Sequence, residues 1–208
     1  MPRNLTRQSN GAKEDSISTK ESIIQAAIEL FGSQGYDGTG VQQIVDMASV
    51  TKGAFYHIFE SKMDLLRYIH DRFLDHMLSV IDRIAKENRS PTDALKAVMR
   101  EILLTVVQYQ AEVAIFIREG RFLEGKIFEE VRSKRDEFTG KLVEVLRKGA
   151  DRGELRDLGD PHALAFGIVG LCSWAYSWYK PEDGPMDRIA DIYTELILGG
   201  LIARPGLP

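Results

Sequence analysis

Residues 39–62, TGVQQIVDMASVTKGAFYHIFESK, decide the fold that this sequence predicts. Their apolar positions form two short helical patterns, one at about 41–48 and one at about 51–59, with only a few residues between them. Helices of about eight residues do not persist alone in water, so both must pack on another helix. The stretch therefore predicts a helix-turn-helix within a three-helix unit.

The preceding residues supply the third helix of this unit. Ser18 and Glu21 have the spacing of a capping box, which predicts that the first helix begins near Thr19. Apolar residues then recur at three- and four-residue steps, and Gly35 predicts a left-handed stop soon after Ser33. Residues 1–17 show no periodicity and predict a flexible tail.

The rest of the chain also follows a helical period. Ser61 and Asp64 open a long fourth helix that is expected to reach about Asn88, and Ser90 with Pro91 opens a fifth. Glycine and proline signals separate the further expected helices, at about 111–118, 125–149, 161–179 and 185–203. The sequence thus predicts an all-α fold of about nine helices, with a small domain at 18–60 and a helical bundle at 61–208.

The composition is that of an ordinary globular protein. The chain has 208 residues, of which 44% are hydrophobic and 28% charged, and no apolar run approaches the roughly 20 residues that cross a bilayer. The N-terminus lacks an apolar signal core, and the one cysteine, Cys172, cannot form an internal disulfide. We therefore expect a cytoplasmic protein without a membrane partner.

The formal net charge of −4 argues against a protein that coats nucleic acid without specificity. It leaves room for a small DNA-reading face, and residues 51–59 have the chemistry for one. Lysine can donate to guanine, a threonine or alanine methyl can meet the thymine methyl, and glycine admits close backbone approach. Tyr56 can reach a phosphate oxygen, and Lys62 is expected to form a second phosphate clamp in the first turn of the fourth helix.

The continuous stretch from Ile23 to Leu66 resembles the TetR family of bacterial transcription regulators. Thr39, Tyr56, Phe59 and Lys62 are landmarks that a bare helix-turn-helix would not require together. The resemblance implies a homodimeric repressor that binds double-stranded operator DNA through its N-terminal domain and an effector through its C-terminal domain.

By position in the family, the second and third helices carry the DNA contacts. Lys52, Gly53, Ala54 and His57 fall at base-contacting positions, and Thr39, Tyr56 and Lys62 fall at phosphate-contacting ones. The complete predicted DNA-binding set is Thr39, Val41, Gln42, Thr51, Lys52, Gly53, Ala54, Tyr56, His57 and Lys62.

The sequence departs from the family pattern at three positions of this stretch. Gly40 stands where a serine or threonine often caps the second helix, Val45 where alanine is usual, and Ser49 where glycine commonly makes the turn. Gly40 puts the phosphate contact of that helix in doubt, although Thr39 could cap it instead. Structural alternatives also stay open for two residues, because Tyr56 could pack between helices and His57 could simply face solvent.

The C-terminal part resembles TetR-family regulators that respond to acyl-coenzyme A thioesters. Trp174, Trp178, Tyr179, Pro181 and Gly184 carry this similarity. An acyl or ring moiety requires an apolar tunnel, and its nucleotide end requires cations near the mouth. The predicted effector site comprises Tyr109, Phe116, Arg118, Arg121, Phe138, Phe166, Trp174 and Trp178, with Lys134 or Arg135 as further candidate cations.

The last two expected helices are apolar on nearly every side, so one buried face cannot account for them. We expect them to pair with their symmetry mates in a homodimer, the alternative being a central helix of a monomer.

Other functions fit the sequence less well. The histidines His57, His70, His76 and His162 show no metal-binding spacing, and Cys172 has no nearby histidine, so we predict no enzyme, metal or cofactor. The alternatives are a TetR-type regulator of drug efflux that responds to other hydrophobic compounds, and a helical adaptor that does not bind DNA.

Overall fold

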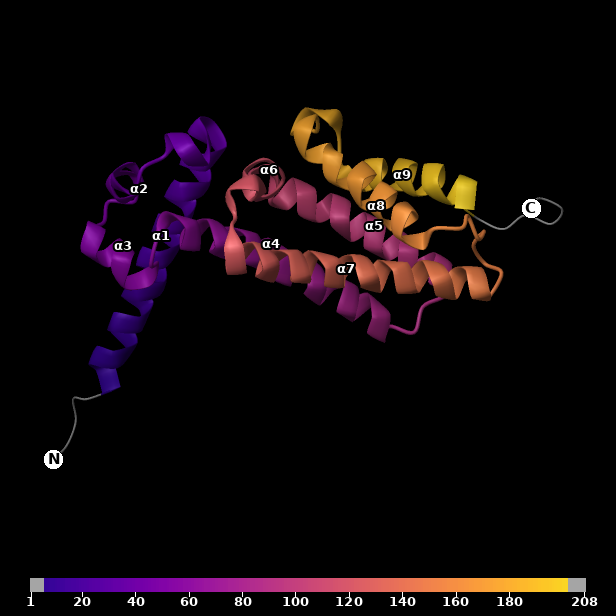
Figure 1. Ribbon diagram of the computed structural model, residues 1–208, viewed down its shortest axis with the longest axis horizontal. Coiled ribbons are helices and arrows are strands. Elements are labelled where there is room, and N and C mark those ends of the chain that lie inside the picture. The colour runs from indigo at the N-terminus through magenta and orange to yellow at the C-terminus, as the bar shows by residue number, and fades with distance from the viewer. Residues whose placement is uncertain (1–5, 202–208) are drawn as a thin grey trace. The chain divides into compact units, whose positions relative to one another are not determined.

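The computed structural model describes the backbone of residues 6–201 and the side chains of residues 19–180 and 182–201. In this part of the chain, nine α-helices and three short 3-10 helices follow one another (Figure 1). The prediction of an all-α fold with about nine helices is confirmed. The helices form two compact units. Unit 1 comprises the chain up to His70 together with Ile115–Glu124, and unit 2 comprises Asp71–Ala114 and the chain from Gly125 onward.

Unit 1 contains the helix-turn-helix. Its core is made of fully buried apolar side chains from four helices, among them Phe31, Ile44, Phe55 and Leu66. The elements are α1 (Thr6–Gly38), α2 (Val41–Met47), α3 (Lys52–Ile58), the start of α4 (Lys62–Lys86), the end of α6 (Gln110–Glu119) and the 3-10 helix η1 (Gly120–Phe122).

The first helix is longer than the sequence pattern predicts. It begins at Thr6 instead of near Thr19, so the segment expected as a tail is helical from Thr6 onward, and residues 1–5 lie outside the described residues. No proline interrupts residues 6–18, and a helix already nucleated in the packed part extends at little cost through such a segment. The predicted break is present, because Gly35 has a φ of 78° and a ψ of 166° inside α1.

Side-chain caps set the predicted starts of two helices in unit 1. The Thr51 hydroxyl accepts a hydrogen bond from the Ala54 amide at 3.1 Å, at the N-terminus of α3. The Ser61 hydroxyl accepts from the Asp64 amide at 3.0 Å, and the Asp64 carboxylate accepts from the Glu60 amide at 3.1 Å. Both ends of this reciprocal pattern satisfy amides that the first turn of α4 leaves unpaired.

Unit 2 is a helical bundle around α5 (Pro91–Gln108). This helix packs against α7 (Gly125–Asp151), α8 (Pro161–Ser173) and α9 (Met186–Leu201) (Figure 1). Leu95, Met99 and Leu103 of α5 are fully buried in the core. The predicted start of α5 is confirmed, because the Ser90 hydroxyl accepts from the Asp93 amide at 3.1 Å and Pro91 is the first helical residue.

The eighth helix ends earlier than predicted, at Ser173 instead of about Tyr179. The 3-10 helices η2 (Trp174–Ser177) and η3 (Pro181–Asp183) follow it. The Gln110 side-chain amide donates to the carbonyls of Tyr176 and Tyr179 at 2.8 and 3.1 Å, so these acceptors are satisfied without a continuing α-helix.

Within residues 6–201, no helix combines the length and the apolar character needed to cross a membrane.

The boundaries of the two units differ from the domain boundary that the sequence pattern predicts. The predicted boundary lies at residue 60, whereas unit 1 extends to His70 within α4 and takes in Ile115–Glu124 from much later in the chain. Sequence periodicity identifies helices one at a time, and it carries no signal for a distant segment that packs on an earlier unit.

Candidate nucleic-acid interface and effector site

The outer face of α3 is exposed along its length. Phe55 on the inner face is fully buried, whereas the neighbouring Tyr56 is 55% exposed and its ring meets Phe55 edge-on at 5.2 Å. Lys52, Gly53 and His57 are exposed as well. This short capped helix therefore presents lysine, glycine, tyrosine and histidine outward from a fixed apolar anchor, and Tyr56 does not take the alternative position in the core.

The second helix offers fewer free groups than expected. Gln42 is exposed, but its amide donates to the Asp46 carboxylate at 2.7 Å. Val41 is half-buried. Gly40, the residue before α2, has no side chain to cap it, and instead its amide donates to the Gln43 side-chain oxygen at 2.7 Å.

The turn between α2 and α3 has the backbone of a glycine turn although it contains serine. Ser49 has a φ of 56°, in the left-handed region that favours glycine. The Ser49 and Val50 amides donate to the Asp46 and Val45 carbonyls at 3.2 and 2.9 Å, which closes the turn. The departure from the family pattern at this position leaves the geometry intact.

Thr39 does not lie where a phosphate contact is predicted. It is 1% exposed, and its hydroxyl donates to the Gly35 carbonyl at 2.8 Å. The hydroxyl thus turns inward, to a backbone carbonyl at the break in α1. The Thr39 hydroxyl therefore does not cap α2, and in this conformation it is not accessible to a phosphate, contrary to both expectations.

Lys62 also has an internal role that the sequence does not indicate. Its ammonium donates to the carbonyls of Tyr36 and Thr39 at 2.7 and 2.8 Å and lies 4.0 Å from the centre of the Tyr36 ring. Burial lowers the pKa of Lys62, an effect that the carboxylate of Asp37 opposes. The ammonium thus holds the turn between α1 and α2, and a phosphate could engage only its remaining donor.

The aromatic residues predicted to line one tunnel are not gathered in one place. Phe138 is buried in the core of unit 2, but Phe166, Trp174 and Trp178 are 55%, 61% and 39% exposed. The mostly apolar α8 buries Ala165 and Ile168 in the core and exposes Phe166 on its other side. The prediction of a tunnel lined by all six aromatics does not agree with this arrangement.

The other two predicted aromatics belong to separate units, and each packs on a histidine of its own unit. Tyr109 lies 5.5 Å from the His76 ring in unit 2, and Phe116 lies 5.1 Å from the buried His70 ring in unit 1.

The candidate cations are engaged by neighbouring groups. Arg118 donates to the Gly32 carbonyl at 3.2 Å, and Arg121 lies 4.8 Å from the centre of the Phe122 ring. Desolvation lowers the pKa of Lys134, but hydrogen bonds to Asp71 and Asp75 outweigh it and leave the pKa raised. Its ammonium lies 2.8 and 2.7 Å from these two carboxylates. Arg135 lies 3.6 Å from the carboxylate of Asp136.

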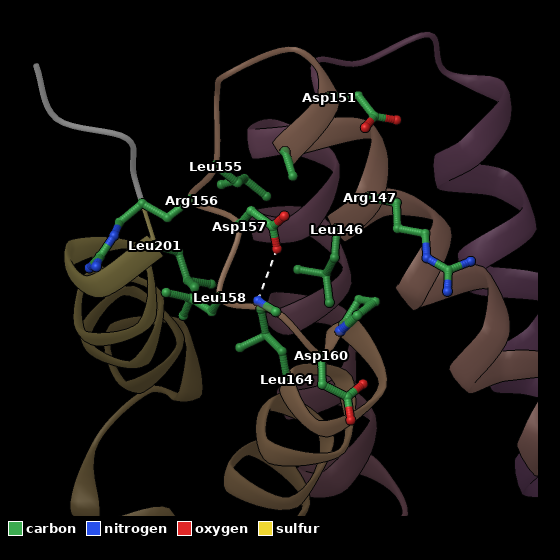
Figure 2. A pocket seen from close by; sticks show the side chains of 13 residues that line it. Leu146, Arg147, Asp151, Leu155, Arg156, Asp157, Leu158, Asp160, Leu164 and Leu201 are labelled. Atoms are coloured by element: carbon green, nitrogen blue, oxygen red, sulfur yellow. Dashed lines mark hydrogen bonds between the residues drawn. The ribbon is translucent and has the colours of Figure 1, made fainter. Parts of the chain in front are cut away.

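The structure does contain pockets in unit 2, but at other positions. Figure 2 shows one of about 250 Å³ at the connection between α7 and α8, where leucines gather between Arg147 and Arg156. A second pocket, of about 510 Å³, lies between α4, α5 and α9 and is lined by Arg83, Arg89 and Arg100 among others. None of the predicted effector residues lines either pocket.

Two functional candidates are not evident from the sequence. Glu119 is a buried carboxylate, 6% exposed, that accepts a hydrogen bond from the Tyr36 amide at 3.4 Å. Gln110 holds the residues that follow α8. Neither belongs to a local motif, because each acts on a part of the chain more than 60 positions away, and only the folded structure reveals such pairs.

Comparisons with known proteins agree with this architecture. Residues 23–69 match the family model "Bacterial regulatory proteins, tetR family", and residues 88–201 match the model "Tetracyclin repressor-like, C-terminal domain". The second match alone covers more than half of the chain. The chain belongs to the TetR family.

Relatives and solved structures extend along most of the chain. The HTH-type transcriptional repressor KstR2 of Mycolicibacterium smegmatis is 26% identical over 193 residues, which cover 91% of this chain and 93% of the relative. The structure of AibR in complex with isovaleryl coenzyme A and operator DNA has a TM-score of 0.77 at 28% identity, over 86% of this chain and 97% of that chain.

The structure of KstR2 of Mycobacterium tuberculosis has a TM-score of 0.81 at 23% identity, over 89% of this chain and 95% of that chain, and supports the fold. The present chain is a ligand-responsive transcriptional regulator with a DNA-binding helix-turn-helix. The family and the relatives confirm the prediction that it is not an enzyme.

Proposed function

We propose that two copies of this chain bind an operator as a homodimer and release it when an acyl-coenzyme A thioester binds to unit 2. The observation that carries the DNA-binding part is α3, which exposes Lys52, Gly53, Tyr56 and His57 while Phe55 anchors it in the core. Lysine and histidine can donate to base edges, and tyrosine can donate to phosphate.

The effector class is supported by likeness to AibR, which was solved with isovaleryl coenzyme A and operator DNA. The KstR2 relatives are repressors, which favours release of the operator over recruitment to it. The 510 Å³ pocket between α4, α5 and α9 is a candidate for the nucleotide end, because Arg83, Arg89 and Arg100 line it. These arginines pair with Glu101, Glu87 and Asp187, so a phosphate would have to take the place of these carboxylates.

An exposed apolar face on α8, η2 and α9 supports the homodimer. Trp174, Ile192 and Leu196 are 61%, 54% and 64% exposed, which is unusual for such large apolar side chains. Gly167 and Gly199 have open space where a Cβ would lie, so a second helix could approach their backbones closely. A partner's identical face would bury these groups in a symmetric interface.

Release of the operator would be a shift between two conformations of the dimer. Two recognition helices must enter successive major grooves, roughly 34–36 Å apart, so a conformation with another spacing binds poorly. An effector that binds this second conformation more tightly draws the population toward it, and emptying the operator requires a preference of several kcal/mol.

The test is a binding assay on the DNA upstream of the chain's own gene, with and without a series of acyl-coenzyme A thioesters. We expect specific binding that at least one thioester abolishes. Lys52→Ala should weaken binding, whereas the control Lys126→Ala, which removes an exposed lysine from α7, should not. Binding that is no tighter than to random DNA would refute the DNA-binding proposal, and binding that no thioester affects would refute the effector class.

The dimer is tested separately by sedimentation. Leu196→Glu places a charge on the exposed apolar face and should convert dimers to monomers. Leu158→Glu is the matched control, because Leu158 is 52% exposed but lies on the connection between α7 and α8. A Leu196→Glu variant that remains dimeric would refute this interface.

A further inference from the structure

Residues 35–40, here called the turn between α1 and α2, begin where the backbone of α1 leaves the helical conformation. The positive φ of Gly35 interrupts α1, and a break in a helix disturbs the regular pairing of the amides and carbonyls near it. Buried backbone groups that lack partners destabilise a fold, so something else must satisfy them. Tyr36, which follows Gly35, is itself buried.

Side chains from three separate places in the chain satisfy these groups. The Thr39 hydroxyl donates to the Gly35 carbonyl, and Lys62 donates to the carbonyls of Tyr36 and Thr39. The Tyr36 carbonyl also accepts from the Thr39 amide at 3.2 Å. The third contribution comes from Ile115–Glu124, which lies far along the chain but belongs to unit 1.

The 115–124 segment contacts the turn at three points. The Glu119 carboxylate accepts from the Tyr36 amide at 3.4 Å, and Arg118 donates to the Gly32 carbonyl at 3.2 Å. The Phe122 ring lies 5.1 Å from the Tyr36 ring, whose other neighbour, Phe31, lies at 5.4 Å. Tyr36 is thereby held at its amide and on its ring by residues of the same short segment.

The position of this turn matters for DNA recognition because α2 begins directly after it. Gly40 precedes the first residue of α2, and α2 in turn packs against α3. A shift at Tyr36 therefore moves the helix pair that carries the exposed face of Lys52, Tyr56 and His57. Groups that fix the turn act on DNA binding although they touch no DNA.

We propose that Glu119 is a positioning residue for DNA recognition, whose buried carboxylate fixes the Tyr36 amide and so sets the placement of α2 and α3. This inference rests on the proposed DNA-binding function and extends it to a residue outside the helix-turn-helix. A carboxylate suits the task because its oxygens accept hydrogen bonds and its length reaches the Tyr36 amide from α6. Glutamine, of nearly the same shape, keeps an acceptor oxygen at the same place.

The test compares three variants of the full-length chain on the DNA upstream of its own gene. Glu119→Ala should weaken specific binding about tenfold or more, the range expected for the loss of a hydrogen bond to a charged group. Glu119→Gln should stay within about threefold of the unmodified protein, since it retains the acceptor. Glu129→Ala is the control, because it removes an exposed carboxylate from α7 that makes no contact with Tyr36, and it should leave affinity unchanged.

Amide hydrogen exchange supplies a readout that general destabilisation would not produce. Exchange at the Tyr36 amide should accelerate in Glu119→Ala and not in Glu119→Gln, while amides in the core of unit 2 remain as protected as before. Faster exchange throughout the chain in both variants would overturn the proposal, because Glu119 would then act on stability alone.

The outcomes separate this inference from the proposed function. If the unmodified protein binds its upstream DNA and Glu119→Ala binds equally well, the positioning role of Glu119 is refuted and the DNA-binding function stands. If the unmodified protein binds no DNA specifically, the proposed function fails and the role of Glu119 in recognition fails with it.

Discussion

Replacing Lys62 by methionine distinguishes two roles that the sequence and the structure assign to the same side chain. As a phosphate clamp, Lys62 would contribute mainly to DNA affinity. As a clamp on the turn between α1 and α2, it would contribute mainly to the folded state. Methionine keeps most of the apolar stem and removes the ammonium, so the substitution isolates the charged end of the side chain.

The contacts of the ammonium indicate the size of the effect. Two hydrogen bonds of 2.7 and 2.8 Å to carbonyls each contribute about 1.5–3 kcal/mol when the donor is charged. The contact with the Tyr36 ring at 4.0 Å adds about 0.5–1 kcal/mol. Because the burial that lowers the pKa of Lys62 offsets part of this gain, we expect Lys62→Met to reduce the free energy of unfolding by about 2–4 kcal/mol.

Two measurements together decide between the roles. Urea unfolding gives the change in stability, and the slope of log binding constant against log salt concentration gives the number of phosphates that the protein neutralises. If Lys62 holds the turn, stability falls and the slope is unchanged. If it is a phosphate clamp, stability is unchanged and the slope becomes shallower by about 0.9 for each phosphate that the variant no longer neutralises.

Lys52→Met is the matched control, because Lys52 is exposed on α3 and its predicted role is contact with DNA. It should lower DNA affinity without changing the urea midpoint. A Lys62→Met protein with the stability of the unmodified protein and a reduced salt slope would refute the reasoning from the structure.

Three further experiments test the packing and the helix capping of unit 2. Gly149→Ala would place a Cβ 2.5 Å from the Leu155 Cδ1 and should destabilise the protein by about 1–3 kcal/mol. Gly140→Ala in the same helix meets open space and should stabilise the protein by up to about 1 kcal/mol. Equal urea midpoints for the two variants would contradict this expectation. Burial raises the pKa of Cys172 to about 12, so its thiol should resist a thiol reagent at pH 8 until urea exposes it, and rapid labelling of the native protein would disprove the assignment. Ser90→Ala removes the cap of α5 and should cost about 1 kcal/mol, which thermal unfolding would detect.

The sequence predicts the local features of the fold well. Helix starts at Thr51, Ser61 and Ser90 follow from short-range chemistry, because each cap joins groups only a few residues apart. The ends of α1 and α8 are harder to predict. The start of α1 lies in a weakly patterned segment, and the end of α8 depends on hydrogen bonds from Gln110, more than 60 positions earlier.

The candidate sites are also predictable to different degrees, because a sequence pattern shows which residues share one helix face and not which distant segments meet. The exposed face of α3 follows from the helical period of one short segment. Lys52, Tyr56 and His57, which are predicted to contact DNA, are exposed on this face. The predicted tunnel requires side chains from several helices to converge, and Trp174 and Phe166 lie on the surface instead. The internal role of Lys62 escapes prediction because its partners are backbone carbonyls, which no residue type marks in a sequence.

The composition of unit 1 from two distant segments has a consequence for how the protein matures during synthesis. The helix-turn-helix leaves the ribosome early, but Glu119, which completes the contacts of Tyr36 together with Phe122, is translated 83 residues after Tyr36. Domains generally fold as units as the chain emerges. The contacts of Tyr36 with this segment can therefore form only after the chain has been extended past Phe122. A nascent regulator would thus acquire its complete DNA-reading unit only after the first part of unit 2, Asp71–Ala114, has been synthesised.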